Sequence, residues 1–204
     1  MVRVFNLFIA LLISPVLTAQ DGSNPLNEYK KMIKATATIS PGFMLNNKQT
    51  NIYIHGHIEF FPESKISLRG DAFWFVGAQE KPQLFNGNSM ITFGAAYHLR
   101  KNRFDVAFGL QPGVMLTQPN STMWDTFKNL AHTYYQVNYN YTAVPVISPY
   151  VGLTFYPGKY VNFFAEVRYN NGKYFSYTNG TTLFLSEIKI SAGLGFQIPY
   201  KKNS

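Results

Sequence analysis

The stretch from Asn51 to Val76 reads NIYIHGHIEFFPESKISLRGDAFWFV, and its pattern decides the fold. In its first half apolar residues alternate with polar ones, so that one parity holds Tyr53, His55, His57 and Glu59. The polar turn 62–65 follows, and the alternation then resumes as far as Val76. A period of two indicates a β-strand with two chemically different faces. Two such strands joined by a short turn predict a β-hairpin, which is the template for the rest of the chain.

The composition is unusual for a water-soluble domain. The 204 residues are enough for one domain and a targeting segment. Aromatic residues make up 17% and charged residues 14%, against roughly 25% charged in an average soluble domain. Yet no stretch after residue 20 is apolar for the ~18 residues that a membrane helix needs. The absence of cysteine excludes disulfides, cysteine nucleophiles and thiolate metal sites.

The net charge of +8 raises the question of an anionic partner, either nucleic acid or anionic lipid. The lysines and arginines are scattered, however, and never follow one another for more than two residues. The sequence also lacks a Gly-rich phosphate motif and a basic strand interleaved with aromatic residues. We therefore interpret the charge as loop lysines, and we expect no nucleic-acid partner and no cofactor.

Three segments divide the chain. Residues 1–19 have one cation, Arg3, then an apolar core and Ala19, which is the pattern of a secretory signal peptide. Residues 20–31 are polar and are expected to form a flexible N-terminal segment. The remainder, 32–204, is expected to be one β-barrel domain.

Eight alternating segments follow one another along this domain. They lie at about 32–44, 51–61, 66–76, 90–100, 104–117, 145–156, 160–170 and 184–198. The connections alternate between tight turns and the longer loops 79–89, 118–144 and 171–183, with a short link at 46–50 on the loop side. An even number of strands with short turns at one end and longer loops at the other is the plan of an outer-membrane barrel. Both chain termini then lie at the short-turn end.

Volume decides which face of the strands points inward. A soluble barrel also alternates, with its apolar face inside. An eight-stranded barrel, however, has an interior just wide enough for side chains to fill. The apolar face carries rings such as Trp74, Phe93, Phe108 and Phe163, whereas the other face mixes charges with glycine and alanine. The sequence therefore predicts an all-β, eight-stranded, antiparallel up-and-down transmembrane β-barrel with its polar face inside.

The charges on the polar face balance. This face holds five cations and five anions, namely Lys34, Arg69, Arg100, Arg168 and Lys189 with Glu59, Asp71, Asp105, Glu166 and Glu187. Charges removed from bulk water have to be paired, because each unpaired ion costs several kcal/mol. We therefore predict an ion-pair network in the barrel interior, with His55, His57 and His98 as hydrogen-bonding members. Such a plug leaves no continuous aqueous channel.

Four prolines, Pro41, Pro112, Pro145 and Pro149, fall in or near the expected strands. A closed barrel has no free edge to accommodate residues without an N–H, so they require bulges or strand ends beyond the membrane. We expect the fifth and sixth strands to be irregular near their loop ends.

These features resemble the small outer-membrane β-barrel family of the OmpA/OmpX type, over about 30–200. The last strand, IKISAGLGFQI, resembles the assembly signal of that family through its alternation and Phe196, but the chain continues through Pro199–Ser204. The resemblance implies a non-enzymatic protein in the outer membrane of a Gram-negative bacterium, in contact with outer-membrane lipid. It also implies a membrane-stabilising, adhesion or interaction role. A lipid-modifying enzyme and a minor pore are the alternatives.

A metal site and serine catalysis are two alternatives to simple packing of the interior side chains. His55, His57 and Glu59 share one strand face and could turn toward one metal ion, but no fixed motif supports this, and we expect hydrogen-bonded packing. The strand serines Ser67, Ser186 and Ser191 have no histidine one or two positions away. Catalysis would therefore depend on pairing across strands, which the sequence leaves open.

The loop 118–144 is the candidate partner-binding surface. Its aromatic residues are Trp124, Phe127, Tyr134, Tyr135, Tyr139 and Tyr141. Tyrosine supplies a large contact area at low entropic cost, so this loop and loop 171–183 are expected to present a surface for another protein or a glycan. The alternative is that these rings pack on one another and mark the membrane interface.

Overall fold

The computed structural model describes residues 32–120, 140–176 and 181–200, and these form nine strands. They are β1 (Met32–Met44), β2 (Thr50–Phe61), β3 (Ile66–Ala78), β4 (Phe85–Lys101), β5 (Phe104–Pro119), β6 (Thr142–Phe155), β7 (Val161–Ser176), β8 (Thr181–Phe184) and β9 (Glu187–Pro199). Over these same residues no helix is long and apolar enough to cross a membrane. The expected signal peptide 1–19 and the segment 20–31 lie outside the described residues.

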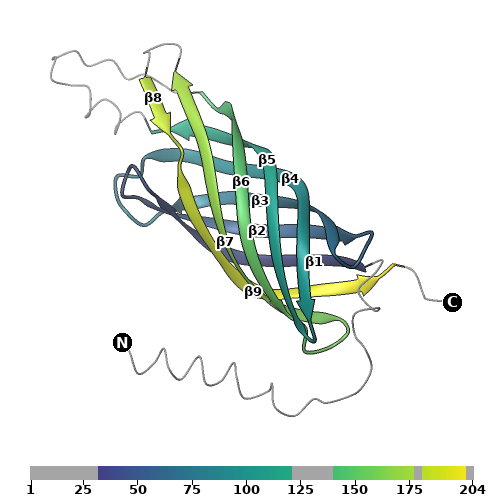
Figure 1. Cartoon of the computed structure of the whole chain (residues 1–204). Coiled ribbons are helices and arrows are strands. Elements are labelled where there is room, and N and C mark those ends of the chain that lie inside the picture. The colour runs from purple at the N-terminus through teal and green to yellow at the C-terminus, as the bar shows by residue number, and fades with distance from the viewer. Residues whose placement is uncertain (1–31, 121–139, 177–180, 201–204) are drawn as a thin grey trace, which may run out of the picture.

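Eight of the nine described strands close into a barrel (Figure 1). Each strand pairs antiparallel with its neighbour in the order β1-β2-β3-β4-β5-β6-β7-β9, and β9 returns to β1. The ninth strand, β8, pairs with β7. The predicted all-β, eight-stranded up-and-down barrel is confirmed.

The two ends of the barrel differ, as predicted. Met32 at the start of β1 pairs with Pro199 at the end of β9, so both described ends of the chain lie at one rim, here named the short-turn end. The β2–β3, β4–β5 and β6–β7 turns lie at the same rim. Asn102, in the β4–β5 turn, adopts a φ of 55°, a left-handed conformation that asparagine tolerates better than most residues. The opposite rim is named the loop end.

Several strands are longer than the sequence predicted. β4 begins at Phe85 rather than near residue 90, and β7 continues to Ser176, so residues 85–89 of the expected loop 79–89 and most of the expected loop 171–183 are strand. The expected eighth strand, 184–198, is wrong as one continuous element, since it is divided into β8 and β9. Both pieces keep the same register on β7, and the Leu185 N–H donates to Gly172 O between them (2.9 Å). The chain therefore continues along β7 through the break.

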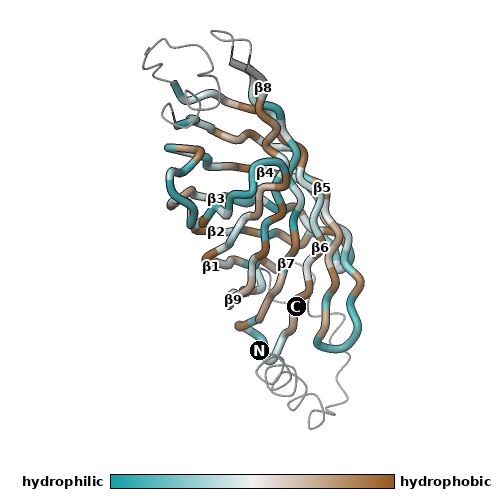
Figure 2. The backbone as a smooth tube through the Cα atoms, turned by 90° about the vertical axis from the view of Figure 1, so that its left-hand side faces the viewer, coloured by the Kyte–Doolittle hydropathy of each residue, from teal (hydrophilic) through white to brown (hydrophobic). Residues whose placement is uncertain are grey.

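The outer face of the barrel is apolar. Ile58, Trp74 and Phe93 leave 61–69% of their surface exposed. The alternation of hydrophobic and hydrophilic residues along the strands is visible in Figure 2. In the described strands this face carries charges only at Lys101 and Lys173, which lie at opposite rims.

The height of this apolar face matches a membrane. From Ile66 to Val76 the outward residues of β3 are apolar or small. Ten residue steps of roughly 3.4 Å, inclined at about 40–45° to the barrel axis, cover roughly 25 Å along that axis. This is the height of the apolar band in outer-membrane barrels. The predicted orientation, with rings outside and charges inside, is confirmed.

The prolines disturb strand pairing in the middle of the strands. The irregularity predicted near the loop ends is present for the fifth strand, whose pairing with β4 shifts register between Phe85 and Gly87, but not in the pairing of β6 with β5. β5 and β6 pair with each other without a gap from Phe104 to Thr117. The gaps lie on their other sides, around Pro112 between β4 and β5 and around Pro149 between β6 and β7. A third gap, around Pro41, separates β1 from β9. Here the Ser40 hydroxyl donates to Ile190 O (2.9 Å), which supplies a donor next to a residue that has no N–H.

The interior also contains apolar side chains, which the sequence analysis did not predict. At the loop end it is filled by apolar and aromatic side chains, here named the loop-end core. Its members are Met44, Tyr53, Phe73, Phe75, Leu84, Phe85, Met90, Met115, Val144, Val146, Tyr174, Leu183 and Leu185. A smaller cluster of Met32, Phe61 and Tyr156 lies at the short-turn end. The charged residues lie between these two apolar groups.

Candidate functional site: the ion-paired interior

Four charged residues form a closed ring of alternating sign, here named the central quartet. Arg69 Nη2 lies 2.6 Å from Asp71 Oδ1 and 2.5 Å from Glu166 Oε2. Arg168 closes the ring, because its Nη2 lies 3.1 Å from Asp71 Oδ1 and its Nε lies 2.9 Å from Glu166 Oε1. All four side chains are almost fully buried. Each charge therefore has two partners of opposite sign.

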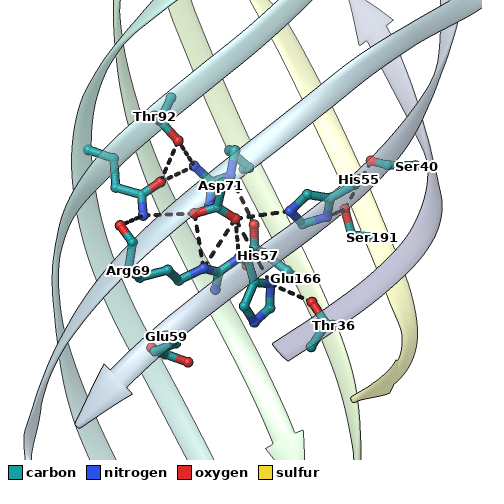
Figure 3. Close-up of polar contacts among 12 residues, drawn as sticks. Thr36, Ser40, His55, His57, Glu59, Arg69, Asp71, Thr92, Glu166 and Ser191 are labelled. Carbon is teal, nitrogen blue, oxygen red and sulfur yellow. Dashed lines mark hydrogen bonds and ion pairs between the residues drawn. The ribbon is translucent and has the colours of Figure 1, made fainter. Parts of the chain in front are cut away.

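The central quartet joins opposite walls of the barrel. Arg69 and Asp71 lie on β3, while Glu166 and Arg168 lie on β7. In the closed order of eight strands, β3 and β7 are four strands apart in both directions, which places them across the interior from each other. On each strand the two charged residues are separated by one outward residue, and their order is reversed. This arrangement places each cation opposite an anion of the other wall. Arg69, Asp71 and Glu166 are seen together in Figure 3.

Neutral polar side chains add hydrogen bonds to the quartet. Gln111 Nε2 donates to Asp71 Oδ2 (2.8 Å), and Gln111 Oε1 accepts from both Thr92 Oγ1 and Arg168 Nη1. Ser148 Oγ also accepts from Arg168 Nη1 (3.1 Å). Buried ions are tolerated when their remaining donors and acceptors are satisfied in this way. The sequence analysis did not identify Gln111 or Ser148 as members of this network.

One aromatic ring packs against both arginines of the quartet. The Tyr150 ring lies 4.5 Å from the guanidinium carbon of Arg69 and 4.6 Å from that of Arg168. A cation over a desolvated ring is stabilised by the ring quadrupole. A Cβ at Gly109 would overlap this ring, so the glycine is what leaves room for it. The small residues of the inward face therefore accommodate a ring as well as long charged side chains.

A second cluster lies toward the short-turn end. Lys34 pairs with Glu59, and Arg100 Nε pairs with Asp105 Oδ2 (3.0 Å). His98 lies between the two carboxylates, with Nε2 3.2 Å from Glu59 Oε1 and Nδ1 3.0 Å from Asp105 Oδ2. The Arg100 guanidinium packs on the Phe61 ring at 4.5 Å. The charges of this cluster are thus paired with one another, and the Phe61 ring covers them on the side of the short-turn end.

The same cluster brings a serine, a histidine and an aspartate together across three strands. Ser67 Oγ lies 2.8 Å from His98 Nε2, and His98 Nδ1 lies 3.0 Å from Asp105. These contacts resemble the order of a serine hydrolase triad. However, the Ser67 hydroxyl donates to Glu59 Oε1 (2.7 Å), and a histidine that accepts no proton from the serine cannot act as its base. Ser67 is also fully buried.

A third group of charges, the pair of Lys189 and Glu187, lies next to the loop-end core. Lys189 Nζ lies 2.5 Å from Glu187 Oε2 and 4.3 Å from the Tyr53 ring. The Tyr53 hydroxyl donates to both oxygens of Glu187 at 3.0 Å, and Asn51 Nδ2 donates to Oε1 at 2.8 Å. With this pair, all ten charged residues that the sequence placed inside the barrel lie in ion pairs. The polar, charge-paired interior is confirmed.

The three interior histidines make hydrogen bonds, and two of them approach a carboxylate that could share a metal. The ligand atoms of His55, His57 and Asp71 lie within 4.8 Å of one another, and Glu59 is not part of this group. Asp71 Oδ1 already accepts from His55 Nε2 (2.9 Å) and contacts both arginines of the quartet. A divalent ion at this point would face two guanidinium groups, which oppose its charge. His57 instead contacts Thr36 Oγ1 through Nδ1 (2.8 Å).

The candidate partner-binding loop falls largely outside the described residues. Trp124, Phe127, Tyr134, Tyr135 and Tyr139 all belong to that undescribed part. Tyr141 is described and is exposed beside Gly87 of β4. The partner surface therefore stays a prediction.

Comparison with known proteins bears on the fold. No protein-family model matches this chain, and no curated protein matches it either. Solved structures do match it. The outer membrane protein OprG from Pseudomonas aeruginosa matches with a TM-score of 0.57 at 10% identity, covering 83% of this chain and 96% of that one.

Two further structures give the same result. The N-terminal β-barrel domain of Pseudomonas aeruginosa OprF has a TM-score of 0.55 at 10% identity, over 83% of this chain and 98% of that one. Neisserial surface protein A has a TM-score of 0.53 at 8% identity, over 83% and 96%. Sequence identities this low carry the fold alone. Together with the apolar outer face, the matches make this chain an eight-stranded transmembrane β-barrel, similar in fold to small outer-membrane proteins.

Proposed function

We propose that this protein is an integral outer-membrane protein of a Gram-negative bacterium with a structural or interaction role and no enzymatic activity. Export by the signal peptide 1–19 is part of the proposal, as is contact of the apolar face with outer-membrane lipid. The loop end then faces outward and the short turns face the periplasm, which is the usual orientation of such barrels.

The observation that carries this proposal is the filled interior. Two apolar clusters flank the central quartet and its neighbouring ion pairs. An eight-stranded barrel has no room for an aqueous channel beside such a filling. This supports a role exercised at the surface of the barrel rather than by passage of solutes through it.

The proposal is tested by purifying the protein from the membrane fraction and recording its gel mobility with and without heating. A folded outer-membrane barrel is expected to migrate differently before and after heating. The same preparation is then reconstituted in planar bilayers. We expect no steady single-channel conductance, and a sustained conductance would contradict the structural role and favour the minor pore.

The proposed partner surface, for a protein or a glycan, consists of loop 118–144 and residues 171–183, which belong mostly to β7 and β8. Support comes from the tyrosine-rich sequence of the first loop and from its position between two strands, β5 and β6, at the loop end. Replacement of residues 121–139 by a short Gly-Ser linker should abolish capture of the partner by intact cells. A matched variant with the turn 62–65 replaced should leave capture unchanged, because that turn lies at the opposite rim.

The absence of enzymatic activity is supported by the hydrogen bond of Ser67 to Glu59 and by the full burial of this serine. The experiment compares lipid A mass spectra of cells with and without the protein. Identical spectra are expected. A change that disappears in Ser67→Ala, while the barrel still shows its heat-dependent mobility, would instead support the lipid-modifying alternative.

A further inference from the structure

Four cations lie at the short-turn end, and they are here named the basic collar. They are Lys65 of the β2–β3 turn, Lys101 at the end of β4, Arg103 of the β4–β5 turn, and Lys159 of the β6–β7 turn. The lysines are exposed and Arg103 is half-buried. None of the four forms an ion pair with a carboxylate among the described residues, and Glu63 is the one acidic residue in these turns. The rim therefore carries uncompensated positive charge.

The cations are distributed around the rim. In the closed strand order, the three turns and the junction of β9 with β1 are separated by equal numbers of strands. Each of the three turns carries at least one cation of the collar. The positive charge thus forms an open ring over three of these four points and not a patch on one side.

Aromatic side chains on the outer face lie directly above this ring. Phe104 packs on Phe155 with ring centroids 5.0 Å apart, and Phe60 packs on Tyr200 at 5.1 Å. Tyr160, beside Lys159, is exposed. Aromatic rings of this kind mark the depth of the lipid headgroups. The cations beyond them are therefore at the level of the phosphates.

We propose that the basic collar binds the headgroups of anionic glycerophospholipids in the leaflet next to the short-turn end. The proposal rests on the membrane location given above. Lysine and arginine near an anionic leaflet are attracted to it within about one Debye length, roughly 8–10 Å. A ring fits lipid better than a protein partner, because lipid headgroups surround a barrel on every side whereas a protein docks on one.

The loop end provides the natural contrast. Its described cations outside the interior are Lys48, Lys81 and Lys173. The exposed Glu80 is the acidic residue described at this rim outside the interior. Neutralisation of these three lysines is therefore expected to have less effect on lipid preference than neutralisation of the collar.

The experiment measures the association of spin-labelled phosphatidylglycerol and phosphatidylcholine with the folded full-length protein in phosphatidylcholine vesicles. For the wild type we expect about a threefold preference for phosphatidylglycerol at low salt, decreasing toward one at high salt. The variant Lys65→Gln/Lys101→Gln/Arg103→Gln/Lys159→Gln should lose most of this preference. The control Lys48→Gln/Lys81→Gln/Lys173→Gln should retain most of it.

The outcomes separate this proposal from the proposed function. A quadruple variant that keeps the preference, or a control that loses it equally, overturns the collar as a lipid site. If the quadruple variant fails to fold, the double variant Lys65→Gln/Lys159→Gln should lose about half of the preference, and an unchanged preference overturns the proposal. A wild-type protein that does not insert into vesicles at all contradicts the membrane location itself.

Discussion

The two halves of the barrel interior are built from the same strands but from different chemistry. Toward the short-turn end, β3 contributes Ser67, Arg69 and Asp71, and two and four residues further it contributes Phe73 and Phe75 to the loop-end core. Phe73 marks the boundary, because its ring stacks on His55 with centroids 3.9 Å apart. The inward face of a strand therefore changes from ionic to apolar within one residue pair.

The two halves are therefore stabilised in different ways. The apolar half follows the rules of a soluble core, in which a lost methylene costs free energy in proportion to the cavity left behind. The stability of the ionic half depends on the pairing of its charges. Removal of one partner leaves an unpaired buried ion and lowers the free energy of unfolding strongly, whereas removal of both partners together costs little. A destabilising substitution in the ionic half should therefore be offset by removal of the opposite charge, and one in the apolar half by a side chain of the original volume.

The largest effect is expected in the ionic half. Asp71→Asn leaves both arginines of the central quartet with one carboxylate, Glu166, and should lower the free energy of unfolding by about 3–5 kcal/mol. Urea titration in vesicles, followed by heat-dependent gel mobility, measures the change. The double variant Asp71→Asn/Arg168→Gln keeps the Arg69–Glu166 pair and should lose less than the sum of the two single variants. Additive losses would mean that the quartet is not one unit.

In the apolar half the expected loss is somewhat smaller and depends on volume. Met115 is fully buried in the loop-end core, so Met115→Ala should lower the free energy of unfolding by about 2–4 kcal/mol. Met115→Leu keeps the volume and should cost less than about 1.5 kcal/mol. The same urea titration compares them. Equal losses for the two variants would contradict a close-packed core.

Gly109 tests the space that the ionic half requires. A methyl group there would overlap the Tyr150 ring, which packs on both arginines of the quartet, so Gly109→Ala should cost about 1–3 kcal/mol. Gly109→Ala/Tyr150→Leu should regain part of the loss, since the flexible leucine can move aside. A Gly109→Ala protein as stable as the wild type would show that the ring has room to spare.

The smallest effect is expected outside both halves, at Glu80. Its carboxylate accepts a hydrogen bond from the Thr50 N–H (2.7 Å), which holds the pKa of Glu80 below its ordinary value of 4.5. A lowered pKa stabilises the folded state above the unfolded pKa, and this contribution is lost as the pH falls through the lowered one. Glu80→Gln should therefore differ slightly from the wild type at neutral pH and not at all in acid. Unfolding midpoints at both pH values provide the measurement.

Much of the fold could be predicted because apolar and polar residues alternate along each strand, which identifies its outward and inward faces. The ten charged residues were found inside because each shares a parity with charged or small residues, and an interior that excludes water requires them to pair. The quartet itself was missed. Its sequence signal is the reversed order of Arg69-x-Asp71 and Glu166-x-Arg168 on two segments that lie opposite each other once eight strands close into a ring.

The loop-end core was missed because alternation weakens there. Stretches such as Phe73 to Val76 and Leu183 to Leu185 are apolar on both parities, which is the sign of a strand that is apolar on its inward face as well. The predicted strand boundaries were wrong for the same reason, because each strand was expected to end where the alternation stops. Gln111 and Ser148 could not be identified, because their importance comes from contacts across the interior.

The orientation of the two strand faces is tested most directly by fluorescence quenching in vesicles. In a background of Trp74→Phe and Trp124→Phe, single tryptophans replace Phe93, Phe108, Phe163 or Ile190 on the outer face, and Phe85 in the loop-end core. Lipids brominated on their acyl chains should quench the four outer tryptophans strongly and the one at position 85 weakly. Strong quenching of the outer positions by aqueous acrylamide, with none by brominated lipid, would contradict the assignment of this face to the membrane.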